Sequence, residues 1–153
     1  MKKILIICCL ALAAISCAKQ EYVVYDNPYA FVVADGYGMQ ESTEILAKAS
    51  ATRNYIFCLS SRERQTPLSL YYEIEFGDGL SEGVDFQVET LKGSVVFEPK
   101  SYRDTIQIKF MRHSLSKDKD NTLTIRLTGA SEDVNLGVPG ASARNASHTI
   151  MKK

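Results

Sequence analysis

The sequence predicts an all-β protein, folded as an antiparallel sandwich of about seven or eight strands after an N-terminal signal segment. Three observations lead to this prediction. Apolar and polar residues alternate with a period of two in several segments, which is typical of half-buried strands. Turn-forming residues separate these segments at short intervals, as in sandwich proteins. Strands and helices do not alternate along the chain, so nothing indicates a parallel sheet.

The clearest strand is predicted at residues 68–76. Residues 103–110 and 122–128 repeat its alternation of apolar and polar side chains. Because successive side chains of a strand point to opposite faces, Tyr71 is expected to point outward. The inward face of the first of these strands is expected to carry Leu68, Leu70, Tyr72, Ile74 and Phe76.

Five shorter segments complete the predicted strands: 29–34, 54–60, 84–89, 94–97 and 147–151. Glycine- and proline-containing turns such as Gly77-Asp78-Gly79 and Glu98-Pro99 separate them. Residues 39–51 have weak helical propensity and are equally compatible with a loop that leads into a strand. Residues 129–146 are polar and rich in Gly, Ala and Ser, which predicts an irregular segment.

The first sixteen residues have the three parts of a secretory signal. Lys2 and Lys3 supply a basic start, residues 4–15 are uninterruptedly apolar, and small residues lead up to Cys17. The apolar run is too short to span a bilayer as a helix, which takes about 20 residues. We therefore expect a signal peptide at residues 1–16, a polar tether at residues 17–27 and a single folded domain at residues 28–153.

The junction between Ser16 and Cys17 resembles a lipobox, the cleavage signal of bacterial lipoproteins. The resemblance implies that Cys17 becomes the first residue and carries acyl chains such as palmitate, although Ala14 stands where Leu is more usual. Several acyl chains anchor a protein firmly, because each buried methylene contributes about 0.8 kcal/mol. We therefore expect an outer-membrane lipoprotein of the cell envelope that contacts the membrane through Cys17 and faces either the periplasm or the cell surface.

Charge and cysteine content exclude several classes of protein. Lys2 and Lys3 leave with the signal, so 18 basic residues become 16 against 18 acidic ones, and the mature charge is −2. No basic stripe is present, which argues against a nucleic-acid partner. Cys8 and Cys9 also leave with the signal and Cys17 is acylated, so Cys58 is the only thiol left and no intramolecular disulfide can form. Its apolar neighbours predict a buried strand thiol and not a nucleophile.

Catalytic and metal signatures are missing from the sequence. His113 and His148 are the only histidines, too few for a zinc site with its spaced set of ligands. No G-x-S-x-G elbow supports a hydrolytic triad, and no phosphate-binding or dinucleotide fingerprint occurs. We therefore expect no enzymatic activity and no cofactor.

Six short motifs follow one another in the second half of the chain: GVDF at 83–86, GSVVFEP at 93–99, TIQI at 105–108, LTIRL at 123–127, NLG at 135–137 and HTI at 148–150. With them, the stretch from Tyr71 to Ile150 resembles a Calx-beta-type, immunoglobulin-like domain. Together with the lipobox, the chain is similar to small Bacteroidota lipoproteins of unknown function built on such domains. The resemblance implies an immunoglobulin-like β-sandwich, and many of these families accompany glycan-uptake systems.

Calcium-binding members of that family carry acidic clusters in a strand-end loop and at the close of the domain. Here the equivalent loop, residues 111–116, is basic and polar. Calcium takes about six to eight oxygen ligands, several of them from carboxylates. Asp78, Glu82 and Asp85 cluster locally and are the candidates for a weak calcium site, but solvated turn acids are the favoured interpretation and no metal is expected.

Glycan binding is the function with the most physical support in the composition. Sugars present flat C–H faces that stack on aromatic rings, and the chain has eight tyrosines but no Trp. Tyr37 lies between two glycines, Tyr71 is on the outward face of its strand, and Tyr102 lies beside a turn. These three tyrosines are the candidate ligand-binding residues, with ordinary surface tyrosines as the alternative.

These observations predict a membrane-anchored, non-enzymatic binding or assembly module that takes part in glycan capture or uptake. Its expected partner is a glycan or a larger surface-protein complex. The alternative is a structural or adhesive component, for example a fimbria-associated subunit that pairs with its partner by strand addition. For that alternative, the segment SHTIMKK at residues 147–153 is a candidate edge strand, with its lysines preventing unwanted pairing.

Overall fold

Ten strands make up the secondary structure that the computed structural model describes, which covers residues 27–90 and 93–153. The all-β sandwich prediction is confirmed, with ten strands in place of eight. The strands, in chain order, are β1 (Tyr29–Ala34), β2 (Ser42–Ile45), β3 (Ala51–Ser60), β4 (Leu68–Phe76), β5 (Phe86–Val88), β6 (Ser94–Phe97), β7 (Arg103–Phe110), β8 (Thr122–Ala130), β9 (Asn135–Leu136) and β10 (Ser147–Lys152).

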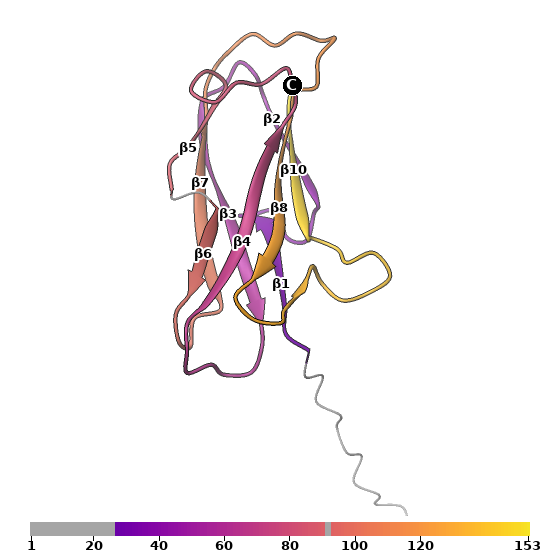
Figure 1. The fold of residues 1–153 in the computed structure, drawn as a ribbon. Coiled ribbons are helices and arrows are strands. Elements are labelled where there is room, and N and C mark those ends of the chain that lie inside the picture. Colours follow the sequence, from indigo (N-terminus) through magenta and orange to yellow (C-terminus); the bar gives the residue numbers. More distant parts are fainter. Residues whose placement is uncertain (1–26, 91–92) are drawn as a thin grey trace, which may run out of the picture.

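Two five-stranded sheets face each other (Figure 1). The first sheet has the order β5-β7-β3-β1-β9, and the second has the order β2-β10-β8-β4-β6. Most neighbours are antiparallel, but β9 runs parallel to β1 and β2 runs parallel to β10. The expectation of antiparallel pairing throughout is corrected at these two edges.

The core lies between the inner faces of the two sheets. In β7, Ile106, Ile108 and Phe110 are buried, whereas the residues between them are exposed. Rings from opposite sheets meet in the middle, where the centroids of Phe57 and Tyr72 lie 4.9 Å apart. Full burial of such a side chain contributes about 1.5–3 kcal/mol, so the alternating pattern supplies the main driving force for folding.

Strand β4 departs from its predicted alternation at its end. A bulge between Tyr71 and Tyr72 shifts its register against β8. The extra residue is Thr128 on β8, and Tyr72, directly after the shift, is still buried. Further along β4, Ile74 is only partly buried and Phe76 is 48% exposed, with its ring packed edge-on against Phe86.

Residues 39–51 form no helix. They contain β2, in which Thr43 and Ile45 are buried, and they lead directly into β3. Pairing with β10 and burial of these two side chains outweigh the weak helical propensity of the segment. Residues 129–146 are irregular as predicted, apart from the end of β8 and the two-residue strand β9.

The segment SHTIMKK is not an edge strand, and that expectation is wrong. Strand β10 lies inside the second sheet, with β2 on one side and β8 on the other. Its His148 and Lys152 side chains are buried. The short strand β2, which the sequence pattern did not reveal, covers the edge of β10.

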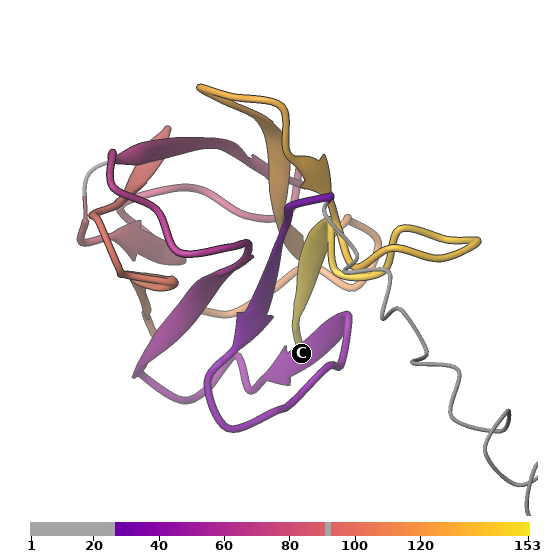
Figure 2. The same cartoon turned by 90° about the horizontal axis from the view of Figure 1, so that it is seen from below.

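The two ends of the sandwich carry different parts of the chain (Figures 1 and 2). The described chain enters at Asn27, at what we call the proximal end, and Lys153 lies at the opposite, distal end. The predicted signal peptide and Cys17 lie outside the described residues. No helix of the described part is long and apolar enough to cross a membrane.

Candidate functional site

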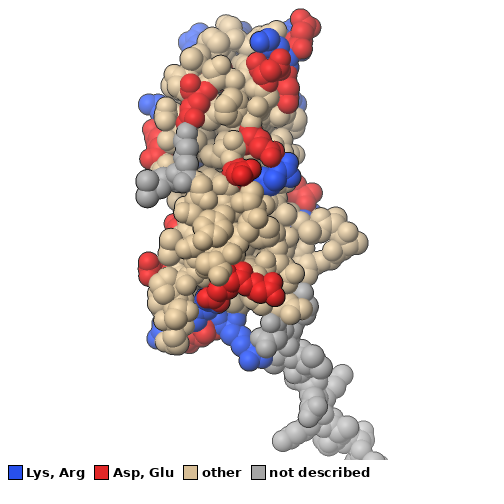
Figure 3. Space-filling view, in the orientation of Figure 1, with Lys and Arg blue, Asp and Glu red and all other residues tan. Residues whose placement is uncertain are grey.

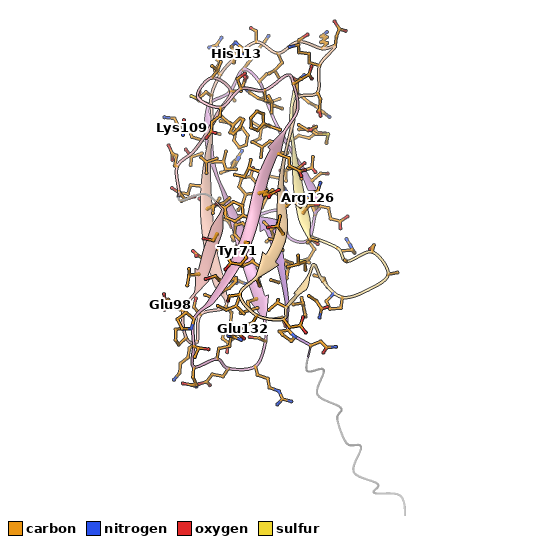
Figure 4. The ribbon with its side chains drawn as sticks, in the orientation of Figure 1. Tyr71, Glu98, Lys109, His113, Arg126 and Glu132 are labelled. Carbon is orange, nitrogen blue, oxygen red and sulfur yellow. The ribbon has the colours of Figure 1, made fainter. Side chains whose placement is uncertain are left out.

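The three tyrosines predicted to bind a ligand lie in three separate places. Tyr37 is 36% exposed, in the turn after β1, beside a hollow that has room for at most about one water molecule. Glycines on both sides of it adopt positive φ angles, 80° at Gly36 and 59° at Gly38, so this turn depends on their lack of a side chain. Tyr71 is 43% exposed on the outer face of β4, beside Gly129 (Figure 4). The structure therefore does not gather the tyrosines into one site.

Tyr102 lines a hollow on the outer face of the first sheet, near the proximal end. We call this hollow the aromatic trough; its volume is about 500 Å³. Tyr29 and Phe31 lie beside each other in it, with ring centroids 6.0 Å apart and ring planes inclined by 26°. The trough is lined by Tyr29, Phe31, Cys58, Leu59, Ser60, Ser61, Tyr102 and Arg103.

Strand geometry explains how the trough forms. Tyr29 and Phe31 are two residues apart in β1, so both rings project from the same face of the sheet. Cys58 on β3 is the cross-strand neighbour of Phe31. The backbone N–H of Leu59 donates to the carbonyl of Tyr102 at 2.9 Å, which holds the turn before β7 against the end of β3.

Cys58 is buried, as predicted, although it lies on the outer face of its sheet. Burial raises the pKa of its thiol, and the nearby Arg103 offsets this only in part. The thiol is therefore protonated at neutral pH and forms an inert wall of the trough.

Tyr29 and Phe31 were not among the predicted ligand-binding residues. They occupy alternate positions of a correctly predicted strand, so the period of two already places both rings on one face. The exposure of that face beside Tyr102 depends on how β1, β3 and the turn before β7 meet.

A buried ionic network holds the distal end together. The Lys152 ammonium donates to Asp85 Oδ1 at 2.8 Å, and the two side chains are only 1% and 3% exposed. His113 Nδ1 lies 3.0 Å from the same oxygen, and the backbone N–H of Ser81 donates to Oδ2 at 3.0 Å. The backbone N–H of Met111 donates to the Asp85 carbonyl at 3.0 Å. Asp85 thus connects the β4–β5 loop, the β7–β8 loop and β10.

Backbone contacts complete the distal end. His113 N–H donates to the carbonyl of Ala47 at 3.1 Å, and Ala47 N–H donates to the carbonyl of Lys153. Gly77 permits a close approach of two loops, because a Cβ there would lie 2.3 Å from the backbone oxygen of Asp120. The β2–β3 loop and the end of the chain are therefore fastened to the same network.

Burial of Asp85 raises the pKa of its carboxyl, but hydrogen bonds from Lys152, Ser81 and His113 outweigh burial and hold the pKa below its ordinary value. Both carboxylate oxygens are occupied by these donors, so Asp85 is no free calcium ligand. Asp78 accepts a hydrogen bond from the backbone of Asp120. Within the described residues, no three His, Cys, Asp or Glu side chains gather as a metal-binding group.

A second hollow, of about 660 Å³, opens at the distal end above the buried network. We call it the basic groove. His113, which marks this end in Figure 4, belongs both to its wall and to the network below. The groove is lined by Leu46, Ala47, Lys48, His113, Ser114, Leu115, Ser116, Lys117, Asn121, Lys152 and Lys153.

The other histidine is part of the core. His148 is fully buried, its Nε2 lies 3.1 Å from the hydroxyl of Thr43, and its ring centroid lies 5.6 Å from that of Tyr55. Burial lowers the pKa of His148, and the carbonyl of Gln40 opposes this only in part, so the ring is neutral at pH 7. His113 and His148 belong to different parts of the fold and form no joint catalytic pair.

On the face shown in Figure 3, acidic and basic residues occur in small separate groups. No protein-family model matches the chain, and no curated protein sequence matches it significantly.

Proposed function

We propose that the chain is a non-enzymatic lipoprotein of the cell envelope, anchored through Cys17, that captures glycans in the aromatic trough. The supporting observation is the grouping of Tyr29, Phe31 and Tyr102 around one open hollow. Aromatic rings offer apolar faces to the C–H surfaces of sugars. Hydroxyl-bearing and charged neighbours supply the polar groups that orient a ligand in such sites.

The polar groups of the trough suit a sugar. Ser60 and Ser61 offer hydroxyls that both donate and accept hydrogen bonds, and Arg103 offers a planar set of donors. Sugar hydroxyls need both kinds of partner. Tyr29 and Phe31 lie on the regular strand β1, so these two rings are held by the sheet and lose little freedom when a ligand binds. Tyr102 lies just before β7, in a turn whose backbone is hydrogen-bonded to Leu59 of β3.

The position of the trough is compatible with anchoring. Asn27 lies ten positions after Cys17, and a chain of this length spans at most about 36 Å. A lipid on Cys17 would therefore keep the proximal end, with the trough beside it, close to the membrane. The distal end would point toward the surroundings.

Strand addition, the alternative function, has less support. The four edge strands are short: β2 and β6 have four residues each, β5 has three and β9 has two. Short edges offer few backbone groups for pairing with another chain and are a common protection against it.

The test is affinity gel electrophoresis of residues 18–153 in gels that contain single neutral polysaccharides. The core of the described residues lies entirely between Ala30 and Ile150, so this form retains it. We expect one or more polysaccharides to retard the protein, and Phe31→Ala and Tyr102→Ala to weaken binding about three- to tenfold. Tyr71→Ala, at an exposed tyrosine outside the trough, is the matched control and leaves retardation unchanged.

Two results would contradict the proposal. One is the absence of retardation across neutral polysaccharides of different linkage. The other is a loss on Tyr71→Ala that equals the loss on Phe31→Ala. Thermal unfolding of each variant separates lost binding from lost folding.

A further inference from the structure

The basic groove has a charge character that the trough lacks. Four of its eleven lining residues are lysines and one is His113, whereas none of the eleven is acidic. Glu44 neutralises Lys153 by an ion pair. Lys152 is already committed to the buried network below.

Two lysines of the groove have no acidic side chain paired with them among the described residues. Neither Lys48 nor Lys117 makes an ion pair among the described residues. Asp118 follows Lys117 in the chain but does not line the groove. Charge complementarity therefore favours an anionic occupant.

The apolar surface of the groove is aliphatic. Leu46 is 70% exposed, more than any other large hydrophobic residue among those described. Leu115 packs partly against the core and faces the same groove. No Phe, Tyr or Trp lines the groove, so it lacks the stacking surface on which sugars bind. Branched aliphatic side chains of a partner would pack on this surface favourably, because they would cover the exposed Leu46 and remove it from water.

The groove is formed before any partner binds. Asp85 holds one wall of the groove through His113 of the β7–β8 loop and another through Lys152 of β10. The backbone of Ala47, in the third wall, is hydrogen-bonded to His113 and to Lys153. A preformed surface loses little conformational entropy on binding. Its three walls come from separate segments of the chain, and it is not enclosed as a site for a small apolar molecule would be.

We propose that the basic groove docks an acidic peptide segment of a partner protein, with aliphatic side chains on Leu46 and Leu115 and carboxylates facing Lys48 and Lys117. The groove would then serve assembly with a second protein at the distal end. This inference does not depend on the glycan trough, which lies on another face.

The experiment is fluorescence anisotropy with residues 18–153 and three labelled peptides of equal length. One alternates Glu and Leu, one alternates Gln and Leu, and one alternates Lys and Leu. We expect the acidic peptide to bind, with an affinity that falls as salt is added, and the neutral peptide to bind about tenfold more weakly. The basic peptide is expected not to bind.

Charge reversal locates the site. The double variant Lys48→Glu/Lys117→Glu is expected to weaken binding of the acidic peptide at least about tenfold, because two attractions become two repulsions. Both lysines lie in loops and make no described ion pair, so folding is expected to persist. Lys109→Glu, on the outer face of β7, is the matched control and leaves the affinity unchanged. Leu46→Ser is expected to weaken both the acidic and the neutral peptide.

Several outcomes would overturn the inference: no binding of the acidic peptide, equal binding of the neutral one, or an effect of Lys109→Glu as large as that of the double variant. Binding to anionic phosphatidylglycerol vesicles that the double variant abolishes, without peptide binding, would assign the groove to a membrane surface instead. Glycan retardation is measured on the same double variant and is expected to be unchanged, so the two proposals fail separately.

Discussion

The aromatic trough and the basic groove are built in different ways. Tyr29 and Phe31 take their places from the alternation of one strand and from its antiparallel neighbour. The groove is built on loops, which are held by contacts between residues far apart in the chain. Asp85 and Lys152, at the centre of these contacts, are separated by 67 positions. A site on strands inherits the stability of the sheet, whereas a site on loops depends on the network below it.

Neighbouring lysines show the same difference at the scale of one residue. Lys152 is the last residue of β10 and points inward to Asp85, and Lys153 pairs with Glu44 where both side chains are more than half exposed. An exposed pair is worth about 0–1 kcal/mol. Removing one partner of a buried pair costs about 3–5 kcal/mol, because the other charge is left without compensation.

The largest expected effect comes from Asp85→Asn, which should weaken the basic groove and leave the aromatic trough intact. Asp85→Asn leaves Lys152 buried without a counter-charge, so we expect the free energy of unfolding to fall by about 3–5 kcal/mol in urea titrations. Binding of the acidic peptide to the groove is expected to fall with it. Glycan retardation by the trough is expected to persist wherever the variant remains folded.

Asp118→Asn, which changes an exposed acid of the β7–β8 loop, is the matched control. A loss below about 1 kcal/mol for Asp85→Asn would show that Lys152 finds another partner or reaches water. Equal losses in both sites would show that the trough also depends on the distal network.

An intermediate effect is expected from pH on the stability of the whole fold, and it should therefore affect both sites together. His148 is buried between the sheets and its pKa is lowered, so the unfolded chain binds a proton that the folded chain does not. Stability is therefore highest above the ordinary histidine pKa of about 6.5 and falls as the pH drops below it. Thermal unfolding between pH 7.5 and pH 5 measures this slope.

His148→Gln is expected to be less stable at neutral pH but to show a flatter slope in that range. A slope that His148→Gln leaves unchanged would contradict the assignment. The lowered pKa of Asp85 acts separately: its contribution is present above the ordinary pKa of about 3.8 and is lost as the pH falls through the lower folded value.

The smallest effect is expected far from both sites. Arg126 donates to both carboxylate oxygens of Glu75, at 3.1 and 2.9 Å, on the outer face of the second sheet (Figure 4). Both side chains are about half exposed. Arg126→Ala is expected to leave the unfolding midpoint, peptide binding and glycan retardation unchanged within error. A clear loss of either binding activity would show that this face takes part in it.

Regular alternation predicted the longer strands closely. The predicted bounds of β1, β4, β6 and β7 coincide with those of the structure. The pattern failed where tertiary contacts decide: β2 is held by β10, and β9 has only two residues beside the start of β1. The two residues of β9 are too few to show a period, and β2 lies in a segment whose weak helical propensity hid its alternation.

The two sites differ in the same way in how far the sequence predicted them. Tyr102 was predicted to bind a ligand, and the trough around it could have been found from the outward positions of β1. The groove could not, because its lysines and leucines come from three segments, and no local pattern shows that Asp85 and Lys152 meet.

The sequence by itself determined the fold class, because a period of two in apolar residues can bury one face of a strand in only one way. Tertiary structure alone decided that the final strand lies inside a sheet, that Lys152 is buried and that loops from three connections close one end. These outcomes depend on which segments meet across long distances in the chain, and that choice is made by the packing of two whole sheets.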